Sequence, residues 1–150
     1  MTPPAQETPR EGELETGNAK QRPSFTPLRR EVLALLQDSH PRPVRAYALL
    51  EALQGQRKHA VAPATVYRTL DFLLAQGLVH RLETLNAYVA CTMPDVSHNA
   101  QFWTCAGCGM VTECHDAAIE NALSERAAAA EFELEDRVIE IAGRCSKCSG

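Results

Sequence analysis

The chain lacks any long hydrophobic run. Across its 150 residues, no apolar stretch approaches the roughly 20 residues that cross a bilayer. The amino terminus carries proline and glutamate instead of the basic and then apolar regions of a secretory signal. With 45% hydrophobic and 23% charged residues, the composition is typical of a globular protein. We therefore expect a cytoplasmic protein with no membrane partner, built as one ordinary domain or two small ones that share a core.

A cytoplasmic location bears on the six cysteines. Because thiols are kept reduced there, a disulfide framework is the less favoured interpretation. Four of the six form two Cys-x-x-Cys pairs, Cys105 with Cys108 and Cys145 with Cys148. In a reducing compartment such pairs are typical of metal ligands.

Two such pairs supply the four thiolates of a closed, tetrahedral structural zinc site. The 36 residues between the pairs can hold one helix and two strands, so the ion would tie the end of the chain to the start of its domain. A redox dithiol and two unrelated structural pairs are the alternatives. A redox motif opens a helix, whereas the first pair lies between strand-like segments beside Gly107 and Gly109, which favours zinc.

Charge is unevenly distributed along the chain. The net charge is −4, yet residues 20–82 carry ten Lys and Arg against four Asp and Glu, while residues 83–150 carry four against eleven. A basic half followed by an acidic half is expected when one part meets phosphate, although two solvated surfaces would look the same.

The basic half predicts three helices and a hairpin. A first helix begins at Thr26 and Pro27, a second lies in "VRAYALLEALQ", and a third spans 64–75 and ends at Gly77. The hairpin spans 78–82 and 87–91, with its turn at 84–86. This order predicts a winged helix-turn-helix whose recognition helix is 64–75.

The acidic half predicts an α+β unit. Its expected elements are a strand at 101–104, a strand at 109–113, a helix at 117–130 capped by Asp116, and strands near 131–135 and 138–142. We expect a disordered arm at 1–24, a winged-helix DNA-binding domain at 25–91, a hinge at 92–100, and a small α/β dimerisation and metal-binding domain at 101–150. The last unit is small, so it should depend on metal, on a second subunit, or on both.

A second set of ligand types straddles the expected hinge: His80, Cys91, His98 and Glu113. Sulfur, two nitrogens and a carboxylate suit tetrahedral Zn²⁺ better than Fe²⁺ or Mn²⁺. An ion held there would fix the angle between the halves. Taken singly, each residue has an ordinary interpretation as a packed histidine, a small buried cysteine or an exposed acid.

The order of these motifs resembles the ferric uptake regulator superfamily. The motifs are "ATVYRTLDFLLAQGLVHRLE", then "CAGCGMVTE", then the terminal "GRCSKC". The chain looks most like the zinc uptake regulator branch, because "CTMPDVSHNAQFWTC" has only His98 with Cys91 where many relatives have three or four histidines. Relatives often carry a histidine before the strand "VIEI", whereas "EDR" stands here, which speaks against a third metal site.

The resemblance implies a dimeric repressor with Zn²⁺ as co-repressor and two zinc ions per chain. It would bind a pseudo-palindromic double-stranded operator and control zinc uptake and homeostasis genes. On the recognition helix, Thr65, Tyr67 and Arg68 are placed to reach DNA. By resemblance Tyr47 joins them, although core packing is its alternative role. We expect Arg29, Arg30, Arg57 and Lys58 to attract the phosphate backbone.

Other function classes have less support in the sequence. A zinc deaminase needs His-x-Glu, which is absent from the chain, and four thiolates leave no open position for water. We therefore expect no enzyme and no small-molecule substrate. A sensor of iron, manganese or peroxide in the same fold, and a zinc-stabilised interaction module without DNA, are the remaining alternatives.

Overall fold

Three helices form the first part of the computed structural model, which describes residues 24–96, 98–135 and 138–149. They are α1 (Pro27–Ser39), α2 (Ala46–Gln56) and α3 (Pro63–Ala75). The Thr26 side chain caps α1 by accepting from the Arg29 N–H at 3.3 Å. Gly77 ends the turn after α3 at φ +67°, a conformation that favours glycine. All three helices match the predicted ones, whereas the predicted arm, except for Ser24, lies outside the described residues.

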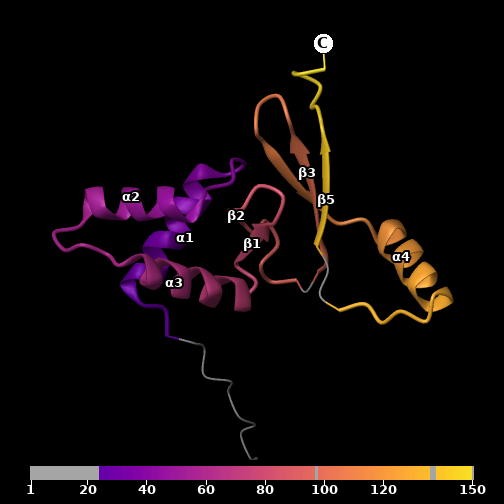
Figure 1. Cartoon of the computed structure of the whole chain (residues 1–150), viewed down its shortest axis with the longest axis horizontal. Coiled ribbons are helices and arrows are strands. Elements are labelled where there is room, and N and C mark those ends of the chain that lie inside the picture. The colour runs from indigo at the N-terminus through magenta and orange to yellow at the C-terminus, as the bar shows by residue number, and fades with distance from the viewer. Residues whose placement is uncertain (1–23, 97, 136–137, 150) are drawn as a thin grey trace, which may run out of the picture.

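The hairpin that follows is the wing: β1 (Val79–Leu82) and β2 (Ala87–Ala90), paired antiparallel. Figure 1 shows it between the helices and a second sheet. Val79 and Tyr88 belong to the helical core, while Leu82 and Val89 pack with Phe102 of the second sheet. The wing is therefore shared between two cores, which explains why all of β2 is buried.

The second sheet has the order β4-β3-β5. Its strands are β3 (Ala100–Cys105), β4 (Val111–Cys114) and β5 (Val138–Gly143). The central β3 pairs antiparallel with β4 and parallel with β5. Because directly paired residues project to the same side of a sheet, the register places Glu113 and Glu140 on the Phe102 face, which meets the wing.

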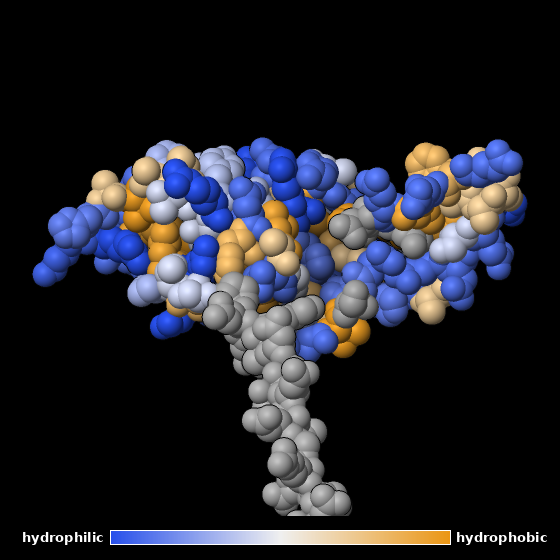
Figure 2. Space-filling model, turned by 90° about the horizontal axis from the view of Figure 1, so that it is seen from below, coloured by the Kyte–Doolittle hydropathy of each residue, from blue (hydrophilic) through white to orange (hydrophobic). Residues whose placement is uncertain are grey.

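Helix α4 (Ala117–Ala129) connects β4 to β5. Asp116 caps it as predicted, accepting from the Ala118 N–H at 2.8 Å. Among the described residues, α4 buries none of its own, and Figure 1 shows it standing away from the sheet. Figure 2 shows hydrophobic side chains at the surface of that end of the molecule. The hydrophobic side chains at this surface are therefore not part of the chain's own core.

One predicted strand is wrong. Residues 131–135 alternate in "EFELE" but form no strand, and Phe132 is 65% exposed. The parallel partner of β3 is β5, and among the described residues no strand pairs with 131–135. Alternation predicts which side chains share a face but does not supply a hydrogen-bonding partner. The "EDR" segment lies partly outside the described residues. In the part of the chain that the structure describes, no helix could span a membrane.

Candidate metal centres

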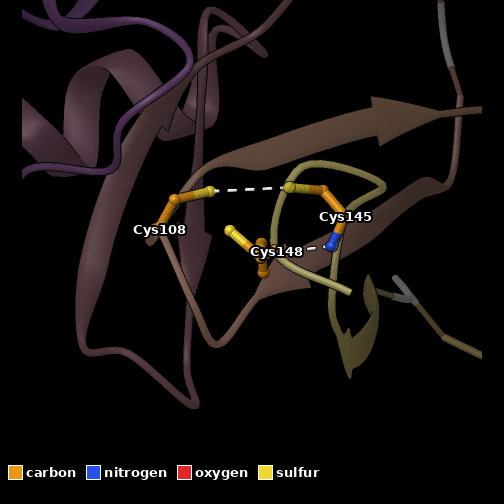
Figure 3. Close-up of side chains that lie close together, drawn as sticks. Cys108, Cys145 and Cys148 are labelled. Carbon is orange, nitrogen blue, oxygen red and sulfur yellow. Dashed lines mark hydrogen bonds between the residues drawn. The ribbon is translucent and has the colours of Figure 1, made fainter. Parts of the chain in front are cut away.

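The four predicted thiols converge on one point. The sulfurs of Cys105, Cys108, Cys145 and Cys148 all lie within 4.8 Å of one another. Figure 3 shows Cys108 and Cys145 directed toward each other across a gap of 3.8 Å between their Sγ atoms. A tetrahedron with Zn–S bonds of about 2.3 Å has edges of about 3.8 Å, so this pair already has the spacing of a zinc shell.

The backbone around the thiols is shaped for a thiolate cluster. The Cys145 N–H donates to Cys105 Sγ at 3.3 Å. That bond, followed by donation from the Cys108 N–H, lowers the pKa of Cys105 to about 6. Hydrogen bonds with Cys145 and the neighbouring thiols raise the pKa of Cys148 to about 12. A Cβ on Gly107 would lie 2.8 Å from the Cys148 Cβ, so only glycine leaves room for the second pair to approach the first.

The second predicted set also converges. His80 comes from β1, Cys91 follows β2, His98 lies in the link, and Glu113 comes from β4. Their ligand atoms lie within 4.8 Å of one another. Glu113 Oε1 is 2.7 Å from His98 Nε2 and 3.0 Å from His80 Nε2. Two of the four ligands thus come from the wing side and one from the far sheet, so the cluster joins the two.

We call this second set the hinge cluster. Hydrogen bonds from neighbouring residues that are not candidate ligands orient its members. The Thr92 N–H and hydroxyl donate to Glu113 Oε2 at 2.7 and 2.8 Å, which leaves Oε1 directed at the centre. His98 Nδ1 lies 2.7 Å from the Val96 carbonyl oxygen. We infer that Nδ1 donates its proton to the Val96 carbonyl, so Nε2, which lies against Glu113 Oε1, is the nitrogen that would give up its proton and bind an ion.

The electrostatics around Glu113 favour a bound cation, whereas Cys91 and His98 would each have to give up a proton to bind one. Burial alone would raise the pKa of Glu113, but the His80 imidazole, the Thr92 donors and His98 together hold that pKa well below its ordinary value. Burial raises the pKa of the Cys91 thiol to about 11, opposed by the Met93 N–H. The Val96 carbonyl, and then Glu113, raise the pKa of His98 against its burial. A divalent ion would compensate a carboxylate whose side chain is only 2% exposed.

A metal ion fits this donor set. His80 Nε2 is buried and lacks hydrogen-bond geometry to any partner among the described residues, although Glu113 Oε1 is 3.0 Å away. Cys91 Sγ lies 3.6 Å from Glu113 Oε1 and 3.8 Å from His98 Nε2. Zinc bonds of about 2.0–2.3 Å to these atom types require edges of roughly 3.3–3.7 Å. The two Cys91 distances are close to that range, whereas Glu113 Oε1 lies nearer to the two histidine nitrogens, at 2.7 and 3.0 Å, and would have to move slightly apart from them.

The predicted DNA-reading residues lie at the surface of the helical part. Tyr47 on α2 is 60% exposed and Tyr67 on α3 is 52% exposed, so core packing is not the role of Tyr47. Arg68 is exposed and Thr65 is half-buried near the start of α3. The side chains are thus available on two neighbouring helices, as a recognition surface requires.

The basic residues expected to attract phosphate are partly engaged within the chain. Arg57 donates twice to Glu31 Oε2, at 2.8 and 2.5 Å. Arg29 donates to the Ser24 carbonyl and lies 3.4 Å above the centre of the Phe72 ring. The charges of Arg57 and Arg29 still add to the positive potential of the helical part, but the positions of their guanidinium groups are fixed by contacts within the chain.

Two contributors were not found from sequence. Thr92 orients Glu113, and Glu140 on β5 bonds the turn of the wing. Thr92 adjoins a predicted ligand, and a residue next to a ligand is a place to look for orienting hydrogen bonds. Glu140 offered no such signal, because its role depends on β5 pairing with β3.

The structure is a winged helix joined to a small sheet, with a cluster of candidate metal ligands between them and a second such cluster at the far end of the sheet. Winged helices are typical of DNA-binding proteins. The "Ferric uptake regulator family" model matches residues 21–142. The zinc uptake regulation protein of Escherichia coli (strain K12) is 42% identical over 127 residues, which are 83% of this chain and 72% of that protein. The chain belongs to the ferric uptake regulator family.

Two solved structures are similar as well. A zinc uptake regulator complexed with zinc and DNA has a TM-score of 0.78 at 38% identity, with 84% of this chain and 83% of that one covered. The crystal structure of holo XcZur has a TM-score of 0.74 at 42% identity, with 83% and 85% covered. The winged-helix and α+β predictions are thereby confirmed.

Proposed function

We propose that the chain is a zinc-responsive transcriptional repressor that binds operator DNA as a homodimer when Zn²⁺ occupies the hinge cluster. The observation that carries the proposal is the convergence of His80, Cys91, His98 and Glu113 from both sides of the wing-to-sheet junction. The similarity to a zinc uptake regulator seen with zinc and DNA supports both the ion and the nucleic acid.

We assign two zinc ions to each chain. Cys105, Cys108, Cys145 and Cys148 would hold a structural ion in a closed all-sulfur shell, with no position for substrate or water. His80, Cys91, His98 and Glu113 would hold the regulatory ion, which supplies positive charge and four directed bonds. Its ligands come from the wing and from the sheet, so binding at this point restrains the angle between them.

DNA recognition is assigned to the exposed surface of α2 and α3. Arg68 would bond a guanine or other purine edge, while Thr65, Tyr67 and Tyr47 would contact bases or phosphates. Two copies related by a twofold axis would place their α3 helices in successive major grooves, so the operator should be pseudo-palindromic.

The uncovered face of the sheet supports a second copy as the partner. Trp103 is 55% exposed and Ile141 is 42% exposed on this face. A hollow of about 530 Å³ lies over it, lined also by Met110 and by Ile119 of α4. Ile141→Asp should give monomers in analytical ultracentrifugation, because a twofold interface receives the new charge twice. Unchanged dimers would remove this face as the interface.

A zinc series tests the function directly. Duplexes selected from random DNA by the zinc-loaded protein would define the operator, and its affinity would then be measured with Zn²⁺, Fe²⁺ and Mn²⁺ under reducing conditions. We expect tightening with Zn²⁺ at the lowest free concentration. A response to Fe²⁺ or Mn²⁺ with indifference to Zn²⁺ would favour a sensor of another metal, and failure to select any duplex would refute the DNA-binding proposal.

A further inference from the structure

The turn of the wing is fastened to the far edge of the sheet by one carboxylate. Glu140 on β5 accepts from the Glu83 N–H at 2.7 Å and from the Thr84 N–H at 3.2 Å through its two oxygens. The Thr84 hydroxyl donates to the same carboxylate. Two successive backbone donors and a hydroxyl around one anion form strong, charge-assisted bonds between segments more than 50 residues apart in sequence.

The turn itself is held in shape for this contact. Arg81 Nε lies 3.2 Å from Glu83 Oε1, and the Arg81 guanidinium also donates to the Asn86 side chain at 3.4 Å. Asn86 has φ +46°, the left-handed conformation that closes the turn. A turn with a fixed shape can transmit a restraint placed at its tip to both strands of the wing.

The contact lies at the opposite end of β1 from the hinge cluster. His80 and Glu83 are three residues apart on an extended segment, which corresponds to about 10 Å. A third contact joins the turn between α1 and α2 to the first cysteine pair: the Val111 N–H donates to the Pro41 carbonyl at 2.9 Å, and Arg42 donates to the Cys108 carbonyl at 3.4 Å. One point of attachment permits rotation about itself, whereas separated points fix an orientation.

We propose that Glu140 is a positioning residue that holds the DNA-reading part at its working angle, through the wing turn and independently of the hinge ligands. The proposal rests on the proposed function for its DNA readout. It also assigns the wing turn to contact with the sheet: the Glu83 and Thr84 N–H groups are occupied by Glu140, so they are unavailable to a DNA phosphate.

Neutralising Glu140 has opposite expected effects on DNA affinity, depending on whether its charge or its contact with the wing turn matters. Removing a negative charge from a DNA-binding protein should tighten DNA binding slightly. Removing the contact should weaken DNA binding. In glutamine an NH₂ group takes the place of one carboxylate oxygen, so it would face one of the two backbone N–H groups as a second donor and could not accept from it. The sign of the change in affinity therefore separates the two explanations.

The test uses the full-length, zinc-loaded dimer and the selected operator duplex. Glu140→Gln is compared with Glu133→Gln, which removes the same charge from an exposed side chain of the same half. Amide hydrogen exchange without DNA is measured at Glu83 and Thr84. We expect faster exchange there and at least about fivefold weaker operator binding for Glu140→Gln, with zinc content and dimerisation unchanged. Glu133→Gln should leave exchange unchanged and binding equal or slightly tighter.

A second variant approaches the contact from the other side. Thr84→Val removes the hydroxyl donor, and its effect on operator binding should be less than additive with that of Glu140→Gln, because both disrupt one interaction. Unchanged exchange at Glu83 and Thr84 in Glu140→Gln would refute the contact. Faster exchange with unchanged or tighter operator binding would refute the positioning role. If the wild-type protein binds no operator, the DNA-binding proposal fails, and the exchange rates alone decide the contact.

Discussion

Thr92→Val should shift the zinc response without altering what the saturated protein does. The hydroxyl of Thr92 donates to Glu113 Oε2 at 2.8 Å, while its N–H donates to the same oxygen at 2.7 Å and survives the substitution. Valine has nearly the same shape but no donor. Loss of an orienting partner of a metal ligand typically weakens metal binding by about 10–100-fold. Because half of the support remains, we expect about tenfold, or about 1.4 kcal/mol.

The assay is fluorescence anisotropy of the labelled operator duplex at buffered free zinc concentrations. For Thr92→Val the midpoint should move to about tenfold higher free zinc, while the affinity at saturating zinc equals that of wild type. Thr112→Val is the matched control, because Thr112 lies on β4 next to Glu113 but is paired with Trp103, on the face away from the wing. An unchanged midpoint for Thr92→Val would show that the Thr92 hydroxyl does not support Glu113 in binding the responding ion, and would refute this reasoning.

Three further substitutions separate the sites. Cys91→Ser should abolish zinc-dependent tightening on the operator while circular dichroism shows an intact fold; unfolding would assign Cys91 to the core instead. Cys105→Ser should lose the tightly held zinc, whose apparent binding energy is about 10–16 kcal/mol in small zinc domains, and the sheet region should unfold. A stable variant that retains two zinc ions would contradict the structural role. Arg68→Ala should lose about 1–3 kcal/mol of discrimination between operator and scrambled DNA, and equal ratios for variant and wild type would exclude Arg68 from base contact.

Sequence reasoning located the helices and the hairpin to within a residue or two, because each has a local signal. Thr26 and Pro27 mark one start, and Gly77 marks one end. Both sets of candidate ligands were chosen from the sequence, and the structure brings the members of each together. That each set binds a metal, and which metal it binds, stays a prediction of the sequence and of the similarity to zinc uptake regulators.

What the sequence could not predict depends on pairing between distant strands. The parallel contact of β3 with β5 places Glu140 on the Phe102 face, opposite the wing turn. No local periodicity distinguishes this register from one in which Glu140 faces outward. The same limit produced the incorrect strand at 131–135, where alternation was present but none of the strands that the structure describes pairs with the segment.

The most direct test measures both directions of the coupling between zinc and operator. Operator affinity is determined with the hinge site filled and with it stripped by mild chelation, and zinc affinity is determined with and without saturating operator. We expect elemental analysis to find two zinc ions per chain before chelation and one afterwards, and the two affinities to change by the same factor, about 5–150-fold. Operator affinity that is independent of zinc at the hinge would contradict the central claim.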